Sequence, residues 1–239
     1  MADNKLDVRV YIVDEPKAKT LAFASIAVND IIAVRGVRVV DGDNGKFVSM
    51  PQSQDKNTGR YHDVAAPATD ELRKEINKAV LDEYNRISSL APDKRGYDKP
   101  DINASNGINA DNIKLDIQVF PIKEPQGSTK AFAKITVDDL ITIHGVRVVG
   151  GEKGNFVTMP QSKDEKDGKP EYFDQAFPIN GDLRKKISKD VLDKFESGDK
   201  SKDKSLADGL KKGAEKAAGQ TPAQRESAPK SRAGAEAIG

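Results

Sequence analysis

The sequence predicts an α+β protein built from two tandem small domains, each an antiparallel sheet of 4-5 strands followed by a C-terminal helix. A seventeen-residue phrase occurs twice, as VRVVDGDNGKFVSMPQS from Val37 to Ser53 and as VRVVGGEKGNFVTMPQS from Val146 to Ser162. Within each copy, apolar residues first alternate with polar ones and then recur at helical spacing. Each copy is roughly 80 residues long, near the low end of what buries a sufficient core. We therefore expect the copies to pack on each other as a pseudo-dimer.

The repeat extends well beyond the shared phrase. Residues 6–53 align with residues 115–162 without a gap, and just over half of the pairs are identical. After two extra residues in the second copy, residues 61–84 align with residues 172–195. The predicted organisation is repeat one at 1–90, a flexible linker at 91–113, repeat two at 114–196 and a disordered tail at 197–239.

The linker and the tail are predicted from composition. Residues 91–112 hold two prolines, two glycines and four asparagines without periodicity, which is typical of a coil. From Glu196 onward there is no aromatic residue, and Lys, Asp, Ser, Gly and Ala dominate. Such a segment buries too little apolar surface to fold alone.

The strands follow from period-2 alternation and from turn residues between the apolar runs. Asn29-Asp30 separates two such runs, and Asn44-Gly45 is a strong hairpin signal because both residues tolerate positive φ. We expect strands over Val8–Ile12, Ala22–Val28, Ile31–Val40, Phe47–Met50 and, after a polar loop at Gln52–Arg60, over Tyr61–Val64.

The last element of each copy is a helix, because the apolar period changes from two to about 3.6. The first copy offers Thr69 or Asp70 as N-cap, and the second offers Asp182. The expected core-facing residues are Leu72, Ile76, Val80, Tyr84 and Ile87 in copy one, and Leu183, Ile187, Val191 and Phe195 in copy two. One helix across one antiparallel sheet buries the apolar surfaces of both.

Composition restricts the classes of function. The chain has 239 residues, 39 basic and 38 acidic residues and a net charge of +1, so phosphate binding requires a local patch. With no cysteine, disulfides and thiolate metal sites are excluded. No run of eighteen apolar residues occurs, so we expect no membrane partner and a cytoplasmic location.

No catalytic or metal-binding constellation repeats in both copies. His62 and His144 occupy non-equivalent positions, where the other copy has Phe173 and Arg35. The DGDNG segment beginning at Asp41 resembles a calcium loop, but the Glu required at loop position 12 is absent. We expect no enzyme activity, no catalytic residue, no metal and no cofactor.

Arg38 and Arg147 lie inside the repeated VRVV sequence, where a strand side chain can project from the solvent face. The guanidinium fork suits phosphate or carboxylate, so these residues are candidate phosphate ligands. The alternative is that both arginines lie on a solvated face or form structural ion pairs, which the same spacing also explains.

The repeated VRVV to MPQS phrase, together with YHDVA from Tyr61 and YFDQAFP from Tyr172, closely resembles the SpoVG family (stage V sporulation protein G, the septation regulators). The resemblance covers nearly all of each copy. It implies small bacterial regulators that bind DNA and RNA, act as homodimers of single domains and affect septation and sporulation. It also implies the fold described above.

The resemblance places nucleic-acid contact in the loop after Met-Pro and in the following helix. Typical members have a Ser-Lys-Arg or Ser-Arg-Lys cluster there, whereas this chain has Gln-Ser followed by interspersed acids. The candidate nucleic-acid-binding residues are therefore Lys56, Arg60, Arg73, Lys163, Lys166, Lys169 and Arg184, with Arg38 and Arg147. The expected function is nucleic-acid-binding (DNA/RNA) regulation by paired repeats, within one chain or in a homo-oligomer. The alternative is a protein–protein interaction module that uses exposed sheet edges.

Overall fold

The computed structural model describes residues 4–14, 18–54, 59–95, 108–125, 127–166 and 169–198. The side chains of residues 164–166 and 169 are outside this description. Most of the predicted linker and all but the first two residues of the predicted disordered tail also lie outside the described residues.

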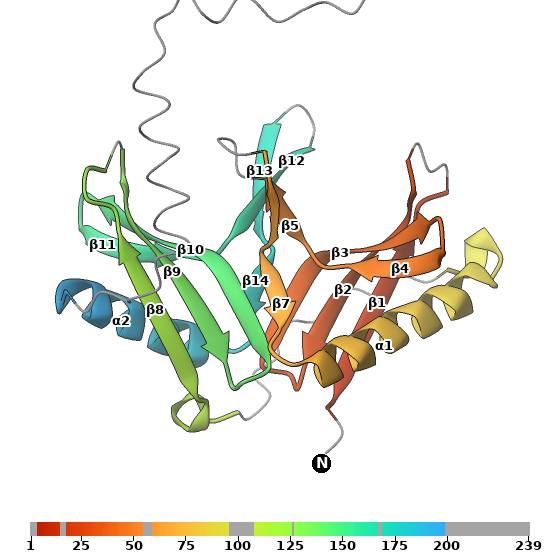
Figure 1. The fold of residues 1–239 in the computed structure, drawn as a ribbon, viewed down its shortest axis with the longest axis horizontal. Helices are drawn as coiled ribbons and strands as arrows, with labels where there is room; N and C mark the ends of the chain where they lie inside the picture. Colours follow the sequence, from red (N-terminus) through yellow and green to blue (C-terminus); the bar gives the residue numbers. More distant parts are fainter. Residues whose placement is uncertain are drawn as a thin grey trace, which may run out of the picture. The chain divides into compact units, whose positions relative to one another are not determined.

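Each half begins with four antiparallel strands (Figure 1). The first half contains β1 (Leu6–Ile12), β2 (Thr20–Val28), β3 (Ile32–Gly42) and β4 (Gly45–Ser49). The second half contains β8 (Leu115–Pro121), β9 (Thr129–Val137), β10 (Ile141–Gly151) and β11 (Gly154–Thr158). These strands agree with the alternation in the sequence.

The turns have the backbone conformations that their residues favour. Asn29 and Asp30 connect β2 to β3 with φ of 51° and 55°, and Gly45 begins β4 with φ of 108°. Gly36 and Gly145 also have positive φ, 76° and 73°, within the long strands β3 and β10. The register of β3 and of β10 shifts beside these glycines, which marks a β-bulge in each half.

The segment after Met-Pro contains more regular structure than the sequence predicts. β6 (Tyr61–Asp63) coincides with the strand expected at Tyr61–Val64, and it forms a hairpin with β5 (Gln52–Gln54), which lies where a polar loop is expected. β12 (Gln161–Lys166) and β13 (Lys169–Asp174) form the matching hairpin in the second half. The sequence signal is weak there because these short strands are polar and exposed.

One helix closes each half, and its cap differs between the halves. In α1 (Asp70–Ser88) the Thr69 side chain accepts a hydrogen bond from the backbone N–H of Leu72. In α2 (Gly181–Glu196) the cap is Asn180, which accepts from the N–H groups of two helix residues. The prediction of Asp182 as N-cap is therefore wrong, because the helix starts one residue before it. Two short 3-10 helices, at Pro92–Lys94 and Ala110–Asn112, lie between the halves in sequence.

The two halves exchange one short strand each (Figure 1). β7 (Ala65–Pro67) of the first half pairs with β10, and β14 (Ala176–Pro178) of the second half pairs with β3. Each main sheet thus has five strands, one of them from the other half. The exchange is reciprocal because the repeats are equivalent.

Further backbone hydrogen bonds reinforce both exchanges. The Ala68 N–H donates to the carbonyl of Leu140 at 2.7 Å, and the equivalent Ile179 N–H donates to Ile31 at 2.9 Å. The buried apolar residues of both halves also form one continuous cluster. The two halves therefore share a core.

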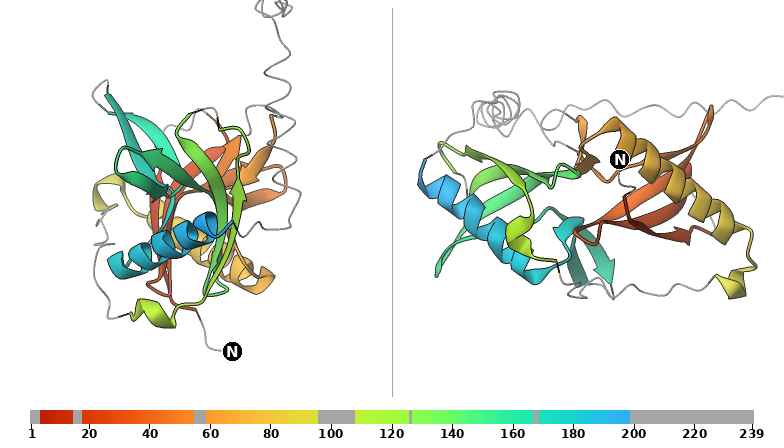
Figure 2. Two further views of the ribbon diagram at one scale, coloured as in Figure 1. Left: turned by 90° about the vertical axis from the view of Figure 1, so that its left-hand side faces the viewer. Right: turned by 90° about the horizontal axis from the view of Figure 1, so that it is seen from below.

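Each helix covers one face of its sheet (Figure 2). Ile76 and Val80 of α1 and Ile187 and Val191 of α2 are fully buried. Strand residues that alternate with the core residues, such as Phe23, remain exposed on the opposite face. We call this opposite face of each sheet the outer face.

Candidate functional site

The outer face of the first sheet carries aromatic rings beside an arginine. Phe23, Arg38 and Ser49 lie side by side on β2, β3 and β4 in the strand register. The Arg38 Nη2 donates a hydrogen bond of 3.4 Å to the Ser49 Oγ. Phe47, two residues before Ser49 on β4, projects to the same face, and its side chain is about half exposed, as is that of Phe23.

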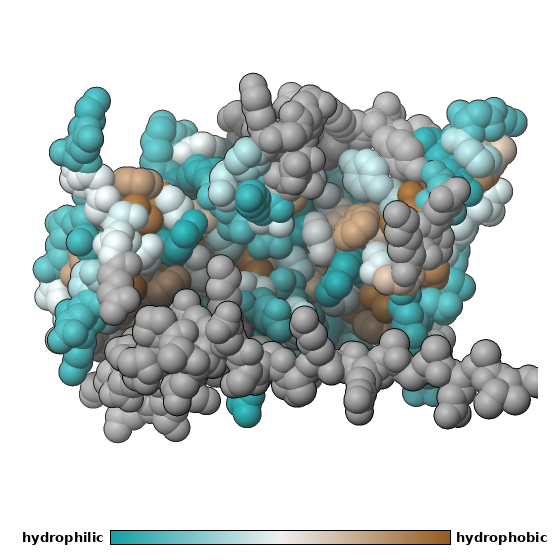
Figure 3. All heavy atoms as spheres, turned by 90° about the horizontal axis from the view of Figure 1, so that it is seen from above, coloured by the Kyte–Doolittle hydropathy of each residue, from teal (hydrophilic) through white to brown (hydrophobic). Residues whose placement is uncertain are grey.

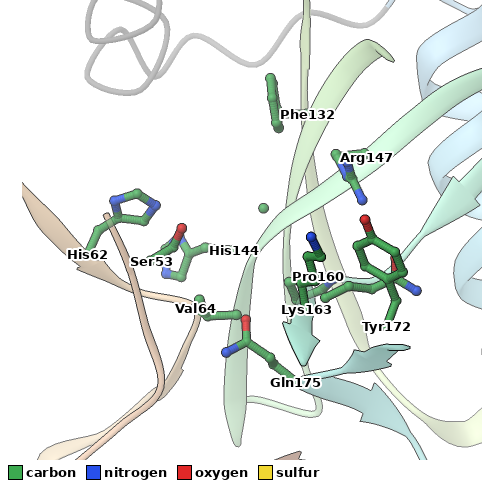
Figure 4. Close-up of a pocket in the computed structure, with 12 residues that line it drawn as sticks. Ser53, His62, Val64, Phe132, His144, Arg147, Pro160, Lys163, Tyr172 and Gln175 are labelled. Atoms are coloured by element: carbon green, nitrogen blue, oxygen red, sulfur yellow. The ribbon is translucent and has the colours of Figure 1, made fainter. Parts of the chain in front are cut away.

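The outer face of the second sheet repeats this arrangement. Phe132, Arg147 and Thr158 occupy the equivalent register positions, and Phe156 is the counterpart of Phe47. The Thr158 Oγ1 is buried without a hydrogen-bond partner in the described part of the chain, and no hydrogen bond to Arg147 replaces the one seen in the first half. Figure 4 shows the Arg147 side chain pointing toward Tyr172 instead.

Exposed aromatic residues gather on the outer faces and the adjoining hairpins. The large apolar side chains that are exposed in the described residues are Phe23, Phe47, Tyr61, Phe156 and Tyr172. In Figure 3, apolar residues form small groups among hydrophilic ones on the side of the molecule shown. On a surface where rings alternate with cations, nucleobases can stack on the rings while phosphates pair with the cations.

The helix arginines are held in ion pairs. Arg184 pairs with Asp174, and the Gln161 Nε2 donates to the same carboxylate at 3.1 Å. In the first half, Arg73 lies 4.0 Å from Asp63, which accepts a hydrogen bond of 3.0 Å from Gln52. These two candidate ligands therefore lie next to a carboxylate, which offsets their charge toward phosphate.

The remaining candidate cations belong to the two hairpins. Lys163 is exposed on β12, and Arg60 is exposed immediately before β6. Lys166 and Lys169 face each other in the register at the end of the β12–β13 hairpin, but their side chains are outside the described set. Lys56 lies outside the described residues altogether.

The structure brings together the two histidines that are non-equivalent in the sequence. His62 on β6 and His144 on β10 line one cavity of about 330 Å³ (Figure 4). They meet because β7 pairs with β10, so that the His144 N–H donates to the Val64 carbonyl at 2.8 Å. Sequence reasoning compared each histidine with its own counterpart and missed this pairing. Sequence comparison finds this proximity only if a position in one copy is compared with a different position in the other copy. A two-fold exchange of strands places position 62 near position 144, and position 173 near position 35.

Burial lowers the pKa of His144 below its ordinary value, and the positive charges of Lys134 and His62 lower it further. The negative charge of Asp63 raises the pKa of His144, but this is the smallest of the four effects. His144 is therefore predominantly neutral near pH 7. In the described residues, no group of three or more His, Asp or Glu side chains is placed to hold a metal ion.

Comparison with known proteins now identifies the family. The SpoVG family model matches residues 4–86 and again residues 113–197. The chain belongs to the SpoVG family. The two matched segments correspond to the two halves of the structure, so this chain carries the SpoVG unit twice.

Individual SpoVG proteins match over one repeat length. The septation protein SpoVG of Clostridium perfringens is 34% identical over 87 residues, which cover 36% of this chain and 94% of the relative. That of Agathobacter rectalis is 40% identical over 82 residues, covering 34% and 90%. That of Anaeromyxobacter is 36% identical over 80 residues, covering 34% and 79%. One repeat of this chain thus accounts for most of each SpoVG relative.

No helix in the described residues is both long enough and apolar enough to span a bilayer.

Proposed function

We propose that this SpoVG-family protein is a cytoplasmic, non-catalytic regulator that binds nucleic acid with the outer faces of its two sheets. The observation that carries the proposal is the matched set of aromatic rings and one arginine on each outer face. Phe47 and Phe156 are 49% and 48% exposed, which leaves their rings accessible to nucleobases. The relatives' names link the family to septation, and we extend that role to this chain.

The chemistry favours single strands over duplexes. Stacking on an aromatic ring requires an unpaired base, and it contributes about 1–3 kcal/mol per base in proteins that bind single strands. In the described residues, eleven Lys and Arg side chains form salt bridges with carboxylates, and the chain is nearly neutral. Binding by ring stacking with a few phosphate contacts fits such a surface better than a purely electrostatic mode.

We further propose that the exchanged halves act together as a pseudo-dimer within one chain. A tethered partner is present at an effective concentration near the millimolar range, so pairing does not depend on expression level. Light scattering of the purified chain tests this. A monomer mass that is independent of concentration is expected, whereas a stable dimer would assign the pairing to separate chains.

Fluorescence anisotropy with labelled single-stranded RNA, single-stranded DNA and duplex DNA tests the binding proposal. We expect Phe47→Ala with Phe156→Ala to weaken single-strand binding at least ten-fold, because two stacking contacts are lost. The control variant Lys78→Gln removes an exposed charge on α1 and should leave binding unchanged. Equal binding by the double phenylalanine variant and the parent would refute the outer-face site.

Salt dependence separates the contribution of the arginines. If Arg38 and Arg147 each neutralise one phosphate of a single strand, replacing both with Gln should reduce the slope of log K against log salt by about 1.4. An unchanged slope would exclude both residues as phosphate ligands.

A protein partner is the second candidate function. β1 and β8 each end a five-stranded sheet and pair with one neighbour, so each presents an edge on which an added strand can pair. Oligonucleotides would then bind no more tightly to the parent than to the phenylalanine variant.

A further inference from the structure

The cavity that contains the two histidines has a lining with a strong bias in charge. Among the described residues that line it, the possible cations are His62, His144, Arg147 and Lys163, and none is Asp or Glu. Carboxylates elsewhere in the fold pair with Arg73 and Arg184, but none in the described residues pairs with Arg147 or Lys163. A hollow whose described lining carries these cations and no carboxylate favours an anion.

The remaining lining residues suit a phosphate attached to a ring. Ser53, Gln161 and Gln175 supply neutral hydrogen-bonding groups, and Phe132 and Tyr172 supply aromatic rings. Figure 4 shows Arg147, Lys163 and Tyr172 grouped on one side of the cavity, with His62, Ser53 and His144 on the other. The volume of about 330 Å³ lies in the range of small-molecule sites.

The cavity is specific to one side of the pseudo-dimer. The positions related to His62 and His144 by the repeat are Phe173 and Arg35. There the Arg35 guanidinium stacks on the Phe177 ring at 4.7 Å, and the hollow that Arg35 lines includes the carboxylate of Asp174. Two identical subunits would carry the same side chains at both places, so this asymmetry exists only because the two units are joined in one chain and have diverged.

We propose that this cavity binds the phosphate group of a nucleotide, with the base against the rings of Phe132 and Tyr172, at one position per chain. Arg147 and Lys163 pair with the phosphate from one side, and His144 donates to it from the other when protonated. Free nucleotides and the nucleotide units of a strand share this chemistry. The site is independent of stacking on Phe47 and Phe156, which do not line the cavity.

Isothermal titration calorimetry of the full chain with adenosine monophosphate, inorganic phosphate and adenosine tests the proposal. We expect adenosine monophosphate to bind with a stoichiometry of one and adenosine to bind at least about ten-fold more weakly, since it lacks the charged group. Lys163→Gln, on an exposed hairpin where folding is not at risk, should weaken nucleotide binding about ten-fold. The charge-matched control Lys78→Gln on α1 should not change it.

The histidines supply a second test. A bound phosphate favours protonated histidine, so binding should tighten from pH 7.5 to pH 5.5 as His144 gains a proton, against the opposing charges of Lys134 and His62 and with the support of Asp63. His144→Gln should abolish most of this pH dependence. Binding that is equal for nucleotide and nucleoside, or unaffected by Lys163→Gln, would overturn the site.

The source of the phosphate is decided by parallel titrations with a single-stranded oligonucleotide. Tight binding of free nucleotide that Lys163→Gln weakens assigns a small-molecule site. A Lys163→Gln effect confined to the oligonucleotide assigns the cavity to the strand. If Phe47→Ala with Phe156→Ala abolishes oligonucleotide binding while nucleotide binding persists, the cavity stands and the outer-face site has a separate role.

Discussion

Reciprocal strand exchange predicts that a cavity made in one half destabilises both halves together. Ile76 in α1 and Ile187 in α2 are equivalent residues, and both are fully buried. Replacing either with Ala should reduce the free energy of unfolding by about 2–5 kcal/mol. For a protein of this size, about 2–4 °C of melting temperature is lost per kcal/mol, so the expected shift is about 4–20 °C.

A probe in the opposite half reports whether the loss is shared. The chain has no tryptophan, and Phe156 on β11 is half exposed, so Phe156→Trp places a fluorescent reporter in the second half with little disturbance. In this background, Ile76→Ala should shift the tryptophan transition and the helical circular dichroism transition by the same amount. The reciprocal pair, Phe47→Trp with Ile187→Ala, is the matched control.

The physical reason is that the halves share one core and two sets of strand hydrogen bonds. Opening either half removes a strand from the other sheet, so the partly unfolded state loses buried area in both. A tryptophan transition that stays in place while half of the helical signal melts earlier would refute coupling by exchange. The halves would then be independent units.

Three further predictions concern local features. Asp174→Asn removes the carboxylate that pairs with Arg184, so single-strand affinity should rise and the salt slope should steepen by about 0.7, measured by anisotropy. Because burial depresses the pKa of His144, protonation opposes folding: the unfolding free energy should fall as pH drops below about 6.5 toward the folded pKa, and His144→Gln should reduce that fall in urea titrations at pH 5 to 8. Asn180→Ala should destabilise the protein by about 1–2 kcal/mol, because its buried side chain caps two N–H groups, and Thr69→Ala, with one such bond, by less.

Much of the fold is predictable because it depends on local patterns. Alternation in Val8 to Ile12 and in Ala22 to Val28 places β1 and β2, and the change of period after Asp70 places α1. The N-cap of α2 was missed because Asn180 and Asp182 both have capping side chains, and their spacing cannot decide which N–H groups are free. The strand β5 was missed because it is short and polar, whereas β6 coincides with the strand expected at Tyr61–Val64.

The candidate site was predictable only in part. Arg38 and Arg147 lie on the outer faces as expected of solvent-facing strand residues, and the structure adds the aromatic rings beside them. The sequence suggested that the helix arginines are available to phosphate, but in the tertiary structure they lie beside Asp63 and Asp174, the last residues of β6 and β13. The use of any of these residues by nucleic acid stays a prediction.

The sequence by itself determined the repeat, the order of strands and helix in each half and the family, because all three depend on residues close together in the chain. Tertiary structure alone decided that β7 and β14 change sheets, since pairing partners more than seventy residues apart leave no local pattern. That exchange places His62 and His144 in one cavity, whereas the repeat-related positions hold Phe173 and Arg35 because the two copies have diverged. In this duplicated chain, residues beside an exchanged strand have neighbours that belong to the other repeat, and the sequence of one repeat alone does not reveal them.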